Sequence, residues 1–152
     1  MTSPSERLRD LGITLPSVAA PAGAYVPAKR SGALVFTAGQ VPFVDGALAA
    51  TGKVGAEITP EQAYDLARTC TLNALAAVDA LVGLDSVAGV VKVVGFVASA
   101  PGFTGQPGVI NGASELLADV FGEAGRHARS AVGVAELPLG APVEVELVVE
   151  LA

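Results

Sequence analysis

The last 24 residues, RSAVGVAELPLGAPVEVELVVELA at positions 129–152, decide the fold class. An arginine opens a stretch of strand-like composition, a Leu-Pro-Leu-Gly segment reverses the chain, and a second stretch alternates glutamate with valine. This alternation places the glutamates on one face of a strand and the apolar side chains on the other. We expect strands at about 129–136 and 142–151, paired as a hairpin. A cation and a carboxylate on adjacent strands of an apolar chain indicate a site for a small carboxylate.

Two helices are predicted before this region. Thr59-Pro60-Glu61-Gln62 combines a threonine cap, a proline at the first helical position and a glutamine at the third. The helix should run to about Val82, with Gly83 behind it. The second helix is expected at about 109–121. A shorter helix should begin at the capping box Ser3-Pro4-Ser5-Glu6 and end at Gly12, followed by an extended connector.

Three further strands complete the expected order. Residues 25–30 predict an edge strand because Pro27 cannot donate to a central ladder. Residues 33–38 predict a buried strand, and residues 87–99 are so apolar that we expect cover on both faces. The fold class is therefore α+β, with one mixed sheet and two helices packed on one face. We expect one domain over residues 1–152, in which residues 1–22 form the N-terminal helix and connector.

Composition predicts self-association. The chain of 152 residues is 51% hydrophobic and only 16% charged, which is more apolar than usual for a soluble domain of this size. Part of that apolar surface should be buried against other subunits, and the sheet face without helices is the natural place for it. We therefore expect a homo-oligomer.

Charge and residue counts exclude several classes of function. The net charge of −6 and the scattered basic residues argue against nucleic-acid binding. The chain holds a single cysteine, Cys70, and a single histidine, His127, so neither an internal disulfide nor a protein zinc site is expected. No apolar run reaches about 18 residues and no leader pattern is present, which predicts a soluble cytoplasmic protein without a membrane partner.

Arg129 and Glu144 are the candidate catalytic residues. The planar fork of an arginine holds a carboxylate through two parallel hydrogen bonds. A partly buried Glu144 would act as a general base on a water molecule, whereas Glu146 and Glu150 are interpreted as a solvated face. In the expected hairpin Arg129 lies opposite about Glu150, roughly 15–20 Å from Glu144. Both would serve one small ligand only if different subunits supplied them, or if this register is wrong.

Three other polar residues have less specific patterns. His127 is interpreted as a loop or interface residue, and Cys70 as a packing residue within the first long helix. Asn111 lies near the start of the second helix, where it either caps the helix or binds a ligand.

Several short motifs, taken together, resemble the RidA (reactive intermediate deaminase) superfamily, also called the YjgF family, over roughly residues 23–151. They are Gly23-Ala24-Tyr25-Val26, Phe36-Thr37-Ala38-Gly39-Gln40-Val41-Pro42, Val109-Ile110-Asn111-Gly112, Ala128-Arg129-Ser130-Ala131-Val132, and Leu137-Pro138 with Val143-Glu144-Val145-Glu146. The chain looks most like a longer branch with an additional N-terminal helix and the run from Gly125 to Ala131.

The resemblance implies a chorismate-mutase-like fold, a homotrimer with sites between subunits, and no cofactor or metal. It implies that Arg129 clamps the substrate carboxylate and that Glu144 positions the hydrolytic water. Gly39 and Ala131 match positions that offer backbone groups, and Tyr25 and Asn111 match side chains in the cleft. The implied reaction is a 2-iminobutanoate/2-iminopropanoate deaminase-like hydrolysis, in which 2-aminoacrylate or 2-iminopropionate gives a 2-keto acid and ammonia.

Departures from the family pattern leave the substrate side chain open. Ala131 and Ala38 replace a cysteine and a serine, Arg126 and His127 add charge nearby, and the N-terminal helix is positioned to cover the cleft. The main alternative is a non-catalytic trimer that binds 2-keto acids or related carboxylates. Ribonuclease and translation-inhibitor activities conflict with the net charge of −6. Chorismate mutase activity is suggested by the fold alone, and a fold does not determine function.

Overall fold

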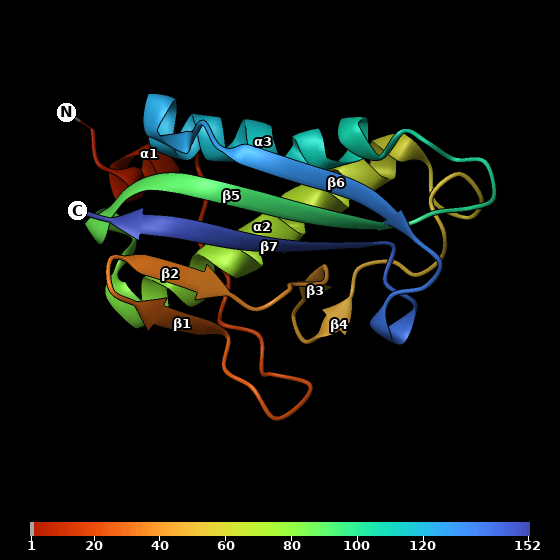
Figure 1. Ribbon diagram of the computed structural model, residues 1–152, viewed down its shortest axis with the longest axis horizontal. Helices are drawn as coiled ribbons and strands as arrows, with labels where there is room; N and C mark the ends of the chain where they lie inside the picture. Colours follow the sequence, from red (N-terminus) through yellow and green to blue (C-terminus); the bar gives the residue numbers. More distant parts are fainter. Residues whose placement is uncertain (1) are drawn as a thin grey trace.

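A five-stranded sheet in the order β1-β2-β7-β5-β6 forms one layer of the structure, a computed structural model that describes residues 2–152 (Figure 1). Its strands are β1 (Ala28–Ser31), β2 (Leu34–Thr37), β5 (Val87–Ala98), β6 (Ala128–Val134) and β7 (Val143–Leu151). Strand β6 runs parallel to β5, and every other pair in the sheet is antiparallel. The predicted mixed sheet is confirmed.

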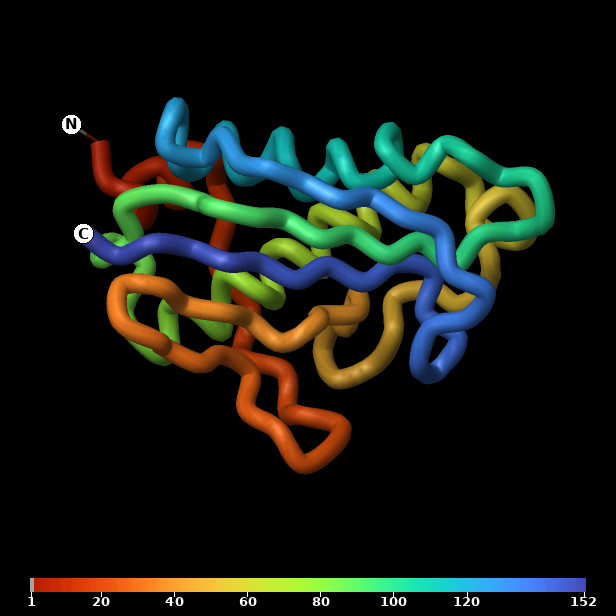
Figure 2. The backbone as a smooth tube through the Cα atoms, viewed as in Figure 1, coloured from red at the N-terminus to blue at the C-terminus, as the bar shows by residue number. Residues whose placement is uncertain are grey.

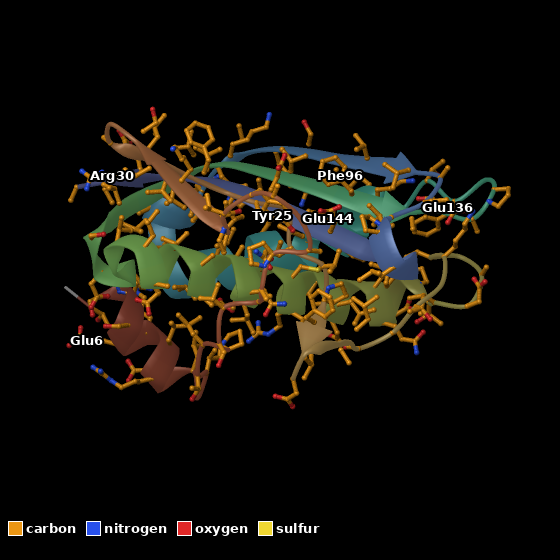
Figure 3. The ribbon with its side chains drawn as sticks, turned by 90° about the horizontal axis from the view of Figure 1, so that it is seen from below. Glu6, Tyr25, Arg30, Phe96, Glu136 and Glu144 are labelled. Carbon is orange, nitrogen blue, oxygen red and sulfur yellow. The ribbon has the colours of Figure 1, made fainter. Side chains whose placement is uncertain are left out.

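The second layer consists of α2 (Pro60–Val82) and α3 (Gln106–Phe121), which cover one face of the sheet (Figure 1). Helix α2 begins as predicted: the Thr59 side chain accepts from Gln62 N, and the Gln62 side chain accepts from Thr59 N. The short helix α1 (Pro4–Asp10) has the predicted capping box between Ser3 and Glu6. Figure 3 shows the sheet and helix layers edge-on.

Small side chains allow the two layers to pack closely. The inward face of α2 includes Ala63, Ala67, Cys70 and Ala74, all fully buried. On α3, a side chain at Gly112 would stand 2.9 Å from the carbonyl carbon of Tyr64 on α2. The core therefore depends on alanine and glycine in the helices facing valines in the sheet. The most deeply buried sheet residues, each at most 1% exposed, are Val35, Val93, Val97, Val143, Val145, Leu147 and Val149.

The predicted hairpin between the last two strands is wrong, because β5 lies between them. Arg129 is paired with Val93 of β5, and Leu147 is paired with the same residue from the other side. A Pro/Gly segment predicts that the chain reverses, but it does not determine which strands pair. The long apolar strand β5 lies between β6 and β7 and pairs with each of them. Helix α3 connects β5 to β6 as a crossover, and this connection allows the two strands to be parallel.

Shorter elements complete the fold. A small hairpin of β3 (Phe43–Val44) and β4 (Ala47–Leu48), which the sequence analysis did not predict, turns at Asp45-Gly46. The 3₁₀ turns are η1 (Leu84–Ser86), η2 (Gly122–Gly125) and η3 (Pro138–Gly140). Within residues 2–152, no helix has the length and apolar character that a bilayer crossing requires.

The sheet face opposite the helices is apolar and accessible. Phe36 of β2 and Val132 of β6 are each 44% exposed, and Val94 and Phe96 of β5 are half-buried on the same face. The predicted uncovered apolar face is therefore present. The predicted cover on both faces of β5 is wrong within one chain, because its outward residue Val91 is 41% exposed.

Candidate functional site

A β-bulge brings Gly39 against Glu144. The β2–β7 ladder pairs Phe36 with Val148 and resumes where Gln40 and Val145 exchange backbone hydrogen bonds of 2.8 and 3.0 Å. Three residues on one strand thus oppose two on the other, and Leu147 N donates to Thr37 Oγ1 in place of a backbone carbonyl. A Cβ at Gly39 would overlap Oε1 of Glu144 and stand 2.8 Å from its Cδ. The close approach requires glycine at this position.

The Glu144 carboxyl is poised to accept a proton. Burial raises the pKa of this half-buried group above its ordinary value, and repulsion from Glu146 acts in the same direction. A raised carboxyl pKa brings the group closer to the range in which it works as a general base and returns the proton as an acid.

Glu144 faces a cavity of about 380 Å³. Gly39, Gln40 and Tyr25 also line it, and most of the remaining lining is apolar. Tyr25 is 50% exposed, and its hydroxyl accepts a hydrogen bond of 3.2 Å from Ala22 N. Three of the residues predicted for the site, Tyr25, Gly39 and Glu144, are therefore brought together around one cavity; Figure 3 labels Tyr25 and Glu144.

Arg129 belongs to a second cluster, at the sheet edge beside α3. Its Nη1 donates to Asn111 Oδ1 at 2.8 Å and to Ser114 Oγ at 3.2 Å, and its Nη2 donates to the Pro107 carbonyl at 3.3 Å. Asn111 therefore orients Arg129 and does not cap the helix; the N-cap position is Gly105. The guanidinium is fixed in direction before any ligand arrives, which lowers the entropy lost on binding.

His127 extends this cluster by one hydrogen bond. Its Nδ1 lies 2.6 Å from the Gly125 carbonyl, which can only accept, so this nitrogen carries the proton. In the neutral imidazole the other nitrogen, Nε2, accepts from the Ser114 hydroxyl at 2.9 Å. Ser114 Oγ in turn accepts from Arg129. The chain of bonds assigns His127 a supporting position behind Arg129.

Ala131 lies two residues beyond Arg129 on β6, opposite Gly95 of β5. Strand β6 is at the edge of the sheet, so part of its backbone hydrogen-bonding capacity points away from β5. A backbone contact from Ala131 to a ligand would be made along this edge.

The two clusters do not converge within one chain. Arg129 of β6 is paired with Val93 of β5, and Glu144 of β7 is paired with Phe96 of β5. The two residues are therefore separated by two strand spacings across the sheet and by three residues along it. At about 4.8 Å between strands and 3.3 Å between residues, their Cα atoms are roughly 14 Å apart. Arg129 contacts α3 on the helix side, whereas Glu144 alternates with the buried valines and points to the other side. One small ligand cannot contact both side chains of the same chain.

Two contributors to these clusters, Ser114 and Leu139, are not predicted from the sequence. Ser114 lies three residues after Asn111 on α3, so both side chains occupy the same helix face, a spacing that could have indicated the pair. Leu139 lines the cavity of Glu144 from η3. The position of the Leu139 side chain follows from the left-handed backbone conformation of this residue, and no sequence pattern indicates that conformation.

Residues 5–151 match the sequence model of the family described as "YjgF/chorismate_mutase-like, putative endoribonuclease". The chain belongs to the YjgF family. Protein TCP17 of Trypanosoma cruzi is 49% identical over 146 residues, which cover 95% of this chain and 91% of that relative.

Two solved structures differ in how closely they superimpose on this chain. A protein of Shewanella oneidensis, named a putative endoribonuclease, superimposes with a TM-score of 0.94 at 35% identity, covering 98% of this chain and 99% of its own. TdcF of E. coli, solved with bound serine, gives a TM-score of 0.66 at 26% identity, covering 91% and 96%. The predicted N-terminal helix is present in the YjgF chain as α1.

Proposed function

We propose that this YjgF-family chain hydrolyses reactive imino acids, and their enamine tautomers, to 2-keto acids and ammonia. The observation that carries the proposal is Glu144, a half-buried carboxyl whose pKa is raised by burial and which faces a cavity large enough for a small metabolite. An imine carbon is already electrophilic, so the protein needs to hold the substrate, orient water and transfer a proton.

The reaction balances with Glu144 as the only protein group that exchanges protons. Water gives one proton to the Glu144 carboxylate as its oxygen bonds to C2 of the iminium, and the C=N π electrons move to nitrogen. Glu144 then returns this proton to the nitrogen of the tetrahedral intermediate. The C–N bond breaks, ammonia leaves with the bonding pair, and the C=O bond forms as the hydroxyl proton passes to ammonia. The products are a 2-keto acid and ammonium.

Arg129 supplies the second requirement, a fixed cation for the substrate carboxylate. Its guanidinium is oriented by Asn111, Ser114 and the Pro107 carbonyl. Bidentate pairing with a carboxylate would fix the position of C2, which lies one bond away from the carboxylate carbon.

The complete site is proposed to form between subunits of a trimer. Arg129 and Glu144 lie on different faces of the sheet in one chain, so a neighbouring subunit must supply one of them. The accessible apolar face around Phe36 and Val132, together with a hydrophobic content of 51%, supports association through the sheet. A mass measurement by light scattering should give three times the chain mass of 15.1 kDa.

A non-catalytic carboxylate-binding trimer is the second candidate. It is favoured by one observation, the serine bound to the E. coli relative TdcF, which is an amino acid with a carboxylate and not an imine. Binding without hydrolysis would need Arg129 but not Glu144. Cleavage of RNA, suggested by the family description, is less compatible with a net charge of −6.

The test is hydrolysis of imines generated in place by an amino-acid oxidase, with the remaining imine trapped by semicarbazide. Wild type should accelerate hydrolysis, and Arg129→Ala and Glu144→Gln should each lose about 100-fold or more. Arg30→Ala and Glu150→Gln are matched controls, since Arg30 is an exposed arginine of β1 and Glu150 is exposed on the same strand as Glu144. No acceleration of any imine by correctly assembled protein would reject the deaminase and leave the binding protein.

A further inference from the structure

Most of the cavity wall around Glu144 has no role in the proposed reaction. Glu144, Gly39 and Tyr25 are three of the residues that line it. The rest of the wall is formed mainly by apolar residues from three separate segments, namely Ala20 and Ala22 of the connector, Val41 and Phe43 after the bulge, and Pro138 and Leu139 of η3. Water activation needs none of these side chains.

Leu139 is the most unusual residue of this wall. Its φ of +62° lies in the left-handed region, which side chains other than glycine, asparagine and aspartate rarely adopt. The side chain is 66% exposed, the largest exposed fraction among the exposed large hydrophobic residues of the described chain. A strained backbone and an exposed leucine both oppose folding, and residues held in this way cluster at ligand sites.

The connector also contributes to the cavity wall, and it is held in place. Ile13 and Leu15 at its start pack against the core, and Ala22 N near its end donates to the Tyr25 hydroxyl. Figure 2 shows the connector loop before β1 and the η3 turn before β7 projecting on the same side of the molecule. The apolar residues of both segments therefore border one space, with Glu144 inside it.

We propose that this cavity receives the side chain of the imino acid, and that the preferred substrates carry an apolar side chain of leucine to phenylalanine size. The inference rests on the proposed deaminase function. With C2 beside Glu144, the group attached to C2 lies against the apolar wall. A space of about 380 Å³ is the volume of about a dozen water molecules, far more than a methyl group fills. Burial of a larger apolar group gains binding free energy in proportion to its area.

The experiment compares kcat/KM for imines derived from alanine, leucine, phenylalanine and asparagine, again generated by an amino-acid oxidase and trapped with semicarbazide. Asparagine matches leucine in size and shape but is polar. We expect kcat/KM for the leucine and phenylalanine imines to exceed that for the alanine imine by about tenfold or more, and the leucine imine to exceed the asparagine imine similarly.

Leu139→Asn is the decisive variant. Asparagine tolerates the left-handed backbone, so this change keeps the turn and replaces an apolar side chain with a polar one of similar size. It should reduce the leucine-to-alanine ratio of kcat/KM by about threefold to tenfold. Leu139→Ala, which only shortens the side chain, should reduce the ratio in the same direction. Leu11→Asn is the matched control, since Leu11 is 45% exposed at the end of α1 and does not line the cavity.

The possible outcomes distinguish failure of the proposed deaminase function from failure of the proposed apolar pocket. No acceleration of any imine by wild type rejects the proposed function itself. Acceleration that is equal for all imines, or greatest for the alanine imine, overturns the apolar pocket and leaves the deaminase standing. A leucine-to-alanine ratio that stays unchanged in Leu139→Asn, even if all rates fall together, also overturns it, because Leu139 would then serve subunit contacts and not the substrate side chain.

Discussion

Gly39 and Glu144 are packed so closely that no side chain fits between them. A Cβ at position 39 would overlap Oε1 and lie 3.2 Å from Cγ of Glu144. The bulge after β2 therefore sets the position of the carboxylate, and the glycine is required by contact and not by backbone conformation. This relationship connects the local irregularity of the sheet to the chemistry proposed for the site.

Gly39→Ala should disable the reaction more than it disturbs the fold. The added methyl group meets the end of a flexible side chain, so Glu144 rotates away and the structure is retained. A displacement of about 1 Å at a reacting group can reduce the rate about 100-fold, and we expect a loss of that order in kcat. Gly108→Ala is the control, because nothing lies within 4 Å of its added Cβ. Full activity of Gly39→Ala would contradict the role of this contact.

Glu144→Gln should stabilise the protein at neutral and alkaline pH. Burial raises the pKa of Glu144 in the folded state above the unfolded value of about 4.3. Between these two values the folded state holds more protons than the unfolded state, so stability falls as pH rises and the loss is complete above the folded pKa. Glutamine resembles the protonated form and avoids this loss.

The size of the effect is limited because the carboxyl is only half-buried. We expect a melting temperature about 1–2 °C above wild type at pH 8, and no difference below about pH 4. Glu150→Gln, on the exposed end of the same strand, should show no such pH-dependent gain. A lower melting temperature for Glu144→Gln at pH 8 would mean that the charged form is stabilised in the fold.

Ser114→Ala should weaken substrate binding with little effect on turnover. The change removes an acceptor of Arg129 and the donor to His127 Nε2, but leaves Asn111 and the Pro107 carbonyl in place. The guanidinium is less well oriented, and we expect KM to rise about threefold to tenfold with kcat nearly unchanged. Ser31→Ala, at an exposed strand end, should leave both constants unchanged. A fall in kcat at constant KM would assign Ser114 to the chemical step.

Cys70 should be inert in the folded protein. It is fully buried in α2, burial raises its pKa well above the ordinary value, and its Sγ lies 3.6 Å from the Val143 carbonyl. A disulfide reagent should therefore react only after denaturant is added. Cys70→Ser should lower the free energy of unfolding by about 1–3 kcal/mol without changing kcat/KM for imines. Rapid modification of the native protein would show that this part of the core opens.

The predicted helices and strands come from local signals, and these were sufficient for most of the architecture. The Thr59 capping box placed the start of α2, and Gly83 placed its end. Pairing of distant strands is not a local property. The turn at Leu137-Pro138 therefore predicts a hairpin, whereas the structure inserts β5 between the two strands that the turn connects.

The sequence predicts individual residues of the candidate site but not their arrangement in space. An arginine at position 129 and a glutamate at position 144 indicate the chemistry of the site. The distance between these two residues depends on the order of the strands in the sheet. Gly39 was identified through a resemblance, and the physical reason for it is visible only where the bulge brings it onto Glu144. The orientation of Arg129 by Ser114 and His127 depends on how α3 packs beside β6, which no spacing in the sequence determines.

Mixing two inactive variants should restore activity if the site is shared between subunits. Arg129→Ala retains Glu144, and Glu144→Gln retains Arg129. When the two variants are unfolded together and reassembled, sites that combine Arg129 from one variant with Glu144 from the other are intact. Random assembly of a cyclic trimer makes about a quarter of the sites of this kind, so about a quarter of wild-type activity should return.

The control for this complementation is the same mixture without unfolding, in which slow subunit exchange should leave activity near that of the separate variants. The double variant Arg129→Ala/Glu144→Gln mixed with wild type provides the reverse case, because every site that combines the two chains then lacks one of the two residues. Absence of recovery in well-folded mixed trimers would mean that Arg129 and Glu144 act within one chain. The roughly 14 Å between their Cα atoms, and their opposite faces of the sheet, argue against that arrangement.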